Sequence, residues 1–140
     1  MRNTCSSACG KWWHFVPSLS VWAGITWLSL IKSVPVPLMG EIPLADKWGH
    51  MLAYLVFALC MACDGYRVRL PARAIYLWAT VLPVVYGGLI ELIQPHFPPR
   101  TGEWTDWLAD CIGVAVGLVI FGLYHLWDKR RSKRHQCAES

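Results

Sequence analysis

Four apolar segments, each long enough to cross a lipid bilayer as a helix, divide the sequence. They comprise residues 15–31, 46–63, 74–94 and 105–127. Because an α-helix rises about 1.5 Å per residue, segments of about 17 to 23 residues match a hydrocarbon core of ~30 Å. Hydrophobic residues make up 55% of the chain and charged residues only 16%, which is too apolar for a soluble domain of this size. The sequence therefore predicts an all-α fold, a polytopic membrane bundle of four transmembrane helices, with residues 1–140 as a single membrane domain.

The basic residues are distributed unevenly between the two ends of these segments. Ten lie in the amino-terminal tail, the second loop and the carboxyl-terminal tail, and three lie in the first and third loops. The ten are Arg2, Lys11, Arg67, Arg69, Arg73, Lys129, Arg130, Arg131, Lys133 and Arg134, and the three are Lys32, Lys47 and Arg100. The positive-inside rule then predicts a multi-pass protein of the cytoplasmic (inner) membrane with both termini in the cytoplasm. Residues 128–140 are expected to form a basic cytoplasmic tail attracted to anionic lipids, and no nucleic-acid partner is predicted.

Acidic residues gather at the opposite, outer ends of the apolar segments. Glu41, Asp46, Glu91, Glu103, Asp106 and Asp110 lie on or near this side, whereas Asp64, Asp128 and Glu139 lie toward the cytoplasm. An ionisable group within a membrane segment costs roughly 2.5 to 3.5 kcal/mol on insertion scales, so several at one depth indicate a functional site. The sequence therefore predicts that any functional site lies on the outer side of the membrane.

Polar residues form one stripe on each of three apolar segments. The stripes comprise Asp46, His50 and Tyr54, then Gly87, Glu91 and Gln94, and finally Asp106, Asp110, Gly113 and Gly117. Residues three or four apart lie on one face of a helix. The Gly-x-x-x-Gly pattern from Gly113 to Gly117 permits close contact with another helix. We therefore expect the three stripes to face one another and to form a polar pocket open to the outside.

Each of these residues also has a purely structural interpretation. Asp46 and Asp106 are suited to capping helix starts, where acids bond free N–H groups. His50 alone is typical of a hydrogen bond between packed helices. Glu91 and Asp110 are harder to explain in this way, because each lies within or beside an apolar run and needs a partner or a proton. As a set, the residues are also compatible with a network of interhelical salt bridges and hydrogen bonds that holds the bundle together.

Three ordered motifs resemble those of the VanZ-like family of small membrane proteins. They are D-K-W-G-H-M-L-A-Y (46–54), G-G-L-I-E-L-I-Q (87–94) and R-T-G-E-W-T-D-W-L-A-D-C-I-G (100–113), and the resemblance covers about the last two thirds of the chain. The family's polar positions fall on Asp46, Lys47, His50, Tyr54, Glu91, Gln94, Arg100, Asp106 and Gly113. Asp110 departs from the family pattern, which commonly has Asn at this position. The resemblance implies a link to the cell envelope and to glycopeptide resistance, chiefly to the lipid-bearing teicoplanin.

Two classes of function remain open for the predicted pocket. In the first, the protein acts on or binds an envelope lipid or glycan, with His50, Glu91 and Asp106 as candidate catalytic residues. The candidate substrate-binding residues are Asp46, Lys47, Tyr54, Gln94, Arg100 and Asp110. In the second, the chain is a non-catalytic membrane interaction protein whose polar network is structural. The sequence alone does not decide whether the protein is an enzyme.

Metal and partner predictions follow from the same residues. A metal site built from His50, Glu91, Asp106 and Asp110 is possible, since mixed histidine and carboxylate sets bind divalent ions, but no tight spacing such as His-Glu-x-x-His supports it, and the sequence assigns no metal ligands. It identifies no cofactor and does not specify an oligomeric state. The expected partners are membrane lipids and an envelope lipid or glycan ligand.

Overall fold

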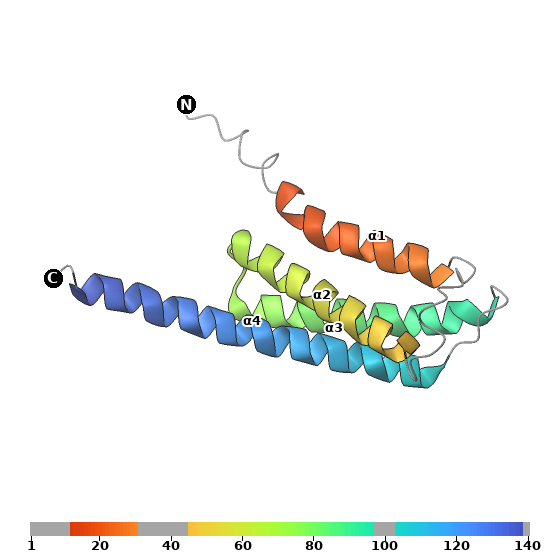
Figure 1. Cartoon of the computed structure of the whole chain (residues 1–140). Coiled ribbons are helices and arrows are strands. Elements are labelled where there is room, and N and C mark those ends of the chain that lie inside the picture. Colours follow the sequence, from red (N-terminus) through yellow and green to blue (C-terminus); the bar gives the residue numbers. More distant parts are fainter. Residues whose placement is uncertain (1–11, 31–44, 97–102, 139–140) are drawn as a thin grey trace, which may run out of the picture.

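The computed structural model describes residues 12–30, 45–96 and 103–138, and within them it contains four α-helices and no strands (Figure 1). The helices are α1 (Val16–Leu30), α2 (Ala45–Arg67), α3 (Ala72–Ile93) and α4 (Trp104–Ala138). A 3-10 turn, Trp12–Phe15, precedes α1, and another, Gln94–His96, follows α3. The predicted all-α membrane bundle is confirmed.

Three of the helical stretches are long and apolar enough to span a membrane. They are Asp46–Arg67, Ala72–His96 and Trp104–Arg131. The remaining helix, α1, has 15 residues and is about 22 Å long. The last helix is longer than predicted, because it continues through the basic segment to Ala138. That segment is rich in the good helix formers Lys and Arg, and no Gly or Pro interrupts it.

Helices α2 and α4 form the most extensive helix pair because two glycines of α4 let their backbones touch. A Cβ atom at Gly113 would overlap the carbonyl oxygen of Met51, and one at Gly117 would lie 2.7 Å from the carbonyl oxygen of Leu55. Side-chain carbons do not approach backbone oxygens this closely, so these positions require glycine. The predicted role of the Gly-x-x-x-Gly pattern is confirmed.

Apolar side chains fill the interior, and others coat the outside. One buried cluster comprises Ile25, Tyr54, Phe57, Ala58 and Val114, and a second comprises Ala62, Ile75, Ala79 and Phe121. Many large hydrophobic side chains, such as Leu52, Leu92 and Leu123, point outward and are exposed. An extensive apolar outer surface of this kind fits contact with lipid rather than water.

The helices run alternately up and down, which sorts their ends into two groups (Figure 1). The start of α1, the α2–α3 connection and the basic end of α4 lie toward one end of the bundle. The start of α2, the end of α3 and the start of α4 lie at the other. The predicted polar stripes therefore lie at the end of the bundle away from the basic segment.

A buried aspartate attaches α1 to the rest of the bundle. Asp64 of α2 is fully buried, and its carboxylate accepts the backbone N–H of Ser18 at 3.2 Å and a guanidinium N–H of Arg67 at 3.0 Å. Ser18 lies in the first turn of α1, where backbone N–H groups lack helical partners and favour a negative charge. Asp64 thus holds the start of α1 against the end of α2.

Helix α2 ends in a tight, left-handed turn. The N–H of Leu70 donates to the carbonyl of Gly65 at 3.0 Å, and that of Arg69 donates to the carbonyl of Tyr66 at 3.0 Å. This bond pattern is the Schellman motif, which requires a left-handed residue after the helix. Arg69 takes that conformation with a φ of 60°, although glycine is the residue that adopts it without strain.

Candidate functional site

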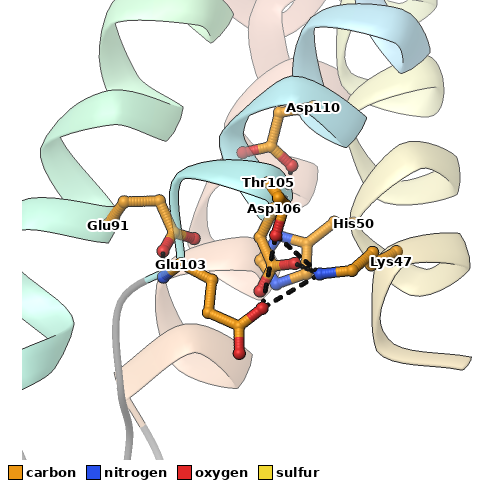
Figure 2. Close-up of polar contacts among 7 residues, drawn as sticks. All are labelled: Lys47, His50, Glu91, Glu103, Thr105, Asp106 and Asp110. Atoms are coloured by element: carbon orange, nitrogen blue, oxygen red, sulfur yellow. Dashed lines mark hydrogen bonds and ion pairs between the residues drawn. The ribbon is translucent and has the colours of Figure 1, made fainter. Parts of the chain in front are cut away.

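A lysine ties the start of α4 to the start of α2. The ammonium nitrogen of Lys47 lies 2.7 Å from Asp106 Oδ1, 2.7 Å from Thr105 Oγ1 and 3.0 Å from Glu103 Oε2 (Figure 2). A lysine ammonium has three N–H donors, and these three oxygens accept all of them. We name Lys47, Glu103, Thr105 and Asp106 the Lys47 clamp. A further anion would therefore have to compete with these partners for Lys47.

The clamp pairs two residues that the sequence assigned to different roles. Asp106, a predicted catalytic residue, is 4% exposed and bonded to Lys47, a predicted substrate-binding residue. Glu103 lies just outside the helix at the exposed edge, where the hydrogen bond from Lys47 lowers the pKa of its carboxyl group. Glu103 and Thr105 were not among the predicted site residues. Their signal was their place beside Asp106 in the third motif, at the start of α4.

A second polar cluster lies beside the clamp and joins α2, α3 and α4. His50 Nδ1 of α2 is 3.1 Å from Asp110 Oδ1 of α4, and Asp110 is only 1% exposed. Gly87 of α3 makes room for this pair, because a Cβ atom there would lie 2.7 Å from Asp110 Oδ2. The same Cβ atom would lie 3.3 Å from Cε1 of Tyr54, which is 1% exposed. Oδ2 of Asp110 and the hydroxyl-bearing end of Tyr54 therefore both border the space above Gly87.

Glu91 of α3 completes this cluster. Its Oε2 accepts the backbone N–H of Glu103 at 2.9 Å, which connects the second cluster to the start of α4 (Figure 2). Its Oε1 is buried and has no hydrogen-bond partner among the described residues. The same is true of the hydroxyl group of Tyr54 and of Nε2 of Gln94. We name His50, Tyr54, Glu91, Gln94 and Asp110 the His50 cluster.

The three polar stripes thus meet at one end of the bundle, as the sequence predicted. Asp46 lies in the first turn of α2 and is exposed. One of its carboxylate oxygens lies within 4.8 Å of ligand atoms of His50 and Asp106. Arg100, a predicted substrate-binding residue, lies outside the described residues.

A tryptophan that the sequence did not single out fixes α4 against α3 beside these clusters. The indole N–H of Trp107 donates to the carbonyl oxygen of Val84 at 3.0 Å. The indole ring rests on Gly88, where a Cβ atom would lie 3.4 Å from Nε1. The neighbouring glycines of α3 therefore each receive one side chain of α4, Asp110 at Gly87 and Trp107 at Gly88.

Two sets of three side chains at this end could supply metal ligands. In the first, ligand atoms of Asp46, His50 and Asp106 lie within 4.8 Å of one another. In the second, ligand atoms of His50, Glu91 and Asp110 do so. Imidazole and carboxylate groups are the donors that divalent ions such as Zn²⁺ and Mn²⁺ accept in proteins. The ligands of the second set come from three different helices, so their spacing along the sequence gave no signal.

Together, the apolar helices and the charged clusters at one end define a small polytopic membrane protein with a polar site near the end of its bundle. The family model VanZ/LLP1 matches residues 4–125, a region that contains the Lys47 clamp and the His50 cluster in full. The chain therefore belongs to the VanZ/LLP1 family, which confirms the resemblance found in its motifs. No curated protein and no solved structure matches the chain.

Proposed function

We propose that the protein binds a lipid-linked component of the cell envelope, such as a polyprenyl-linked or glycan-bearing lipid, at the His50 cluster. The observation that carries this proposal is the set of buried polar atoms without partners among the described residues: Tyr54 OH, Glu91 Oε1 and Gln94 Nε2. Buried polar groups are almost always hydrogen-bonded, and unpaired ones are costly. Phosphate oxygens and sugar hydroxyls have the donors and acceptors that would satisfy all three atoms.

Charge pairing supports a functional role for the His50 cluster. Lys47 is paired with Asp106 and Glu103, and His50 with Asp110. Glu91 has no cationic partner among the described residues and bonds only to a backbone N–H there. An acid left over at the edge of a membrane is the pattern expected of a group that meets a ligand or a proton.

The arrangement of the His50 cluster suits proton transfer. Asp110 contacts Nδ1 of His50, which orients the imidazole ring and leaves its other nitrogen for a ligand. We propose that, when no metal ion occupies the cluster, His50 and Glu91 are the groups that exchange a proton with the bound lipid headgroup. Asp106, the third predicted catalytic residue, serves instead as the ion-pair partner of Lys47 in this proposal.

The proposed location is the cytoplasmic membrane, with both termini in the cytoplasm and the polar clusters at the outer face. Two observations support it: the excess of basic residues in the tails and second loop, and the position of the polar clusters at the opposite end of the bundle. The test is single-cysteine labelling of intact cells with an impermeant reagent in a cysteine-free background. Labelling at Thr101 but not at Ser132 is expected, and the reverse pattern would overturn the orientation.

The alternative function, a non-catalytic interaction protein with a structural network, is supported by the Lys47 clamp. All three donors of Lys47 are used within the protein, and the clamp closes α4 onto α2. Membership of the VanZ/LLP1 family supports a role at the envelope in both cases, and we extend this to susceptibility to teicoplanin.

Replacement of Glu91 separates the two functions. Glu91→Gln keeps the side-chain shape and removes the charge, so a functional Glu91 predicts normal folded yield in detergent with changed susceptibility to teicoplanin and other envelope stress. Glu103→Gln, which removes an exposed acid from the same end, is the matched control and should leave susceptibility unchanged. If Glu91 belongs to a structural ion pair, its removal exposes an unpaired buried charge at a cost of about 3 to 5 kcal/mol and lowers folded yield. The structural function would be favoured if Glu91→Gln lowers the folded yield and a second replacement, of the cation that pairs with Glu91, restores it. Arg100 is the candidate for this cation.

A further inference from the structure

We infer that His50, Glu91 and Asp110 form a binding site for a divalent cation, and that the hydroxyl group of Tyr54 lies beside the bound ion. The three ligands come from α2, α3 and α4 and meet where these helices converge. This inference goes beyond the proposed lipid ligand, because the ion can bind whether or not a lipid does.

The distances between the ligand atoms fit a common ion. One ligand atom from each residue lies within 4.8 Å of the other two, and His50 Nδ1 lies 3.1 Å from Asp110 Oδ1. Ligand atoms about 2.1 Å from one ion are roughly 3 to 4.2 Å apart. A shift of the Glu91 carboxylate by about 1 Å or less would therefore complete the coordination. Glu91 has one oxygen available for this shift, because only Oε2 is bonded to the Glu103 backbone.

Buried polar atoms without hydrogen-bond partners are a second, independent indication that a ligand occupies the site formed by His50, Glu91 and Asp110. Glu91 is 9% exposed, and its Oε1 has no partner among the described residues. Tyr54 is 1% exposed, and its hydroxyl, also without a partner there, lies on the Asp110 side of Gly87. A bound cation would accept Glu91 Oε1 as a ligand. A water molecule on that cation would donate a hydrogen bond to the oxygen of the tyrosine hydroxyl, because metal-bound waters are strong donors.

Charge favours this set of ligands over the neighbouring one. In the set of Asp46, His50 and Asp106, the ammonium of Lys47 is already 2.7 Å from Asp106, so a cation there would face a like charge. With a neutral imidazole, Glu91 and Asp110 carry two negative charges, which one divalent cation balances. Two carboxylates close together near the hydrocarbon core are unfavourable without such compensation.

A bound cation would also give the His50 cluster a means of holding a phosphate. Positive charge is needed for that contact, and all three donors of Lys47 are already used. A divalent ion with open coordination positions binds phosphate oxygens directly. The chemical class of ligand that this site would take is therefore a phosphate-bearing headgroup bridged through the ion.

The test measures Mn²⁺ binding to the purified full-length chain in detergent after treatment with a chelator. Mn²⁺ is chosen because it prefers oxygen and imidazole ligands to thiols, so the cysteines of the chain do not compete. Equilibrium dialysis should find stoichiometric binding to the wild-type chain. Glu91→Gln and Asp110→Asn should each weaken it by at least about 10-fold, since each removes a ligand. Asp46→Asn and Glu103→Gln remove acids at the same end that are not ligands, and they should bind Mn²⁺ as the wild-type chain does.

A second measurement does not depend on the folding of the carboxylate variants. Pulsed electron paramagnetic resonance of Mn²⁺ on the wild-type chain should detect a directly bound imidazole nitrogen. That signal should disappear in His50→Gln and persist in His96→Gln, which replaces an exposed histidine at the same end. Absence of the nitrogen signal, or of stoichiometric Mn²⁺ binding, would overturn the inference. So would a loss of binding in Asp46→Asn as large as that in Glu91→Gln.

Discussion

Substitution of Gly113 by alanine is the most demanding test of how the bundle is held together. A Cβ atom at this position would overlap the carbonyl oxygen of Met51 and lie 3.1 Å from the backbone nitrogen of Leu55. Ordinary contact begins near 3.4 Å, so α2 would have to move away from α4 by about 1 Å. Overpacking of this kind destabilises proteins by about 1 to 3 kcal/mol. The same shift would lengthen the contact between His50 and Asp110, which lies one turn from Gly113.

The matched control is Gly49→Ala, on the exposed face of α2. No atom lies within 4 Å of a Cβ atom at Gly49, so the alanine should stabilise the helix by up to about 1 kcal/mol. Unfolding of both variants in detergent can be followed by tryptophan fluorescence, with the midpoint compared to that of the wild-type chain. The two substitutions should change the unfolding midpoint in opposite directions. A Gly113→Ala protein as stable as Gly49→Ala would refute the close contact of α2 and α4.

Three further predictions concern single contacts. Arg69→Gly should raise the unfolding midpoint, because glycine adopts a φ of 60° without the strain of about 1 kcal/mol that a side chain adds. Trp107→Phe should lower stability by about 0.5 to 1.5 kcal/mol through loss of the hydrogen bond to Val84, measured by the same unfolding assay. Because Lys47 lowers the pKa of Glu103, the stabilisation from this pair is present above the ordinary pKa of a glutamate and is lost as the pH falls through the lowered value. An acid titration of the midpoint should therefore show a smaller fall in Glu103→Gln than in the wild-type chain.

The fold was largely predictable because the bilayer fixes the length of an apolar helix. The apolar segments located α2, α3 and the start of α4 to within a few residues, and the spacing of Gly113 and Gly117 identified a close helix contact. The end of α4 was not predictable from hydropathy. The helix continues past the apolar residues to Ala138 because the basic segment favours helix, although it is polar.

The candidate site was predictable only in part, because periodicity fixes the face of each helix but not how the helices are rotated against one another. The stripes correctly indicated that α2, α3 and α4 bring their polar faces together. They did not indicate that Lys47 bonds Glu103 and Thr105, because those contacts depend on the depth at which α4 begins beside α2. Nor did they show that Gly87 receives Asp110, since a glycine carries no signal of which side chain fills the space above it.

We propose that the His50 cluster binds a ligand and does not only hold the helices together. The most direct measurement is an experimental structure of the full chain prepared with a polyprenyl phosphate. We expect ligand density within hydrogen-bond distance of the Tyr54 hydroxyl and the Gln94 amide, with Glu91 Oε1 also in contact with the ligand. A structure in which Arg100 sits on Glu91 and protein groups satisfy every buried polar atom, with no ligand density, would contradict it.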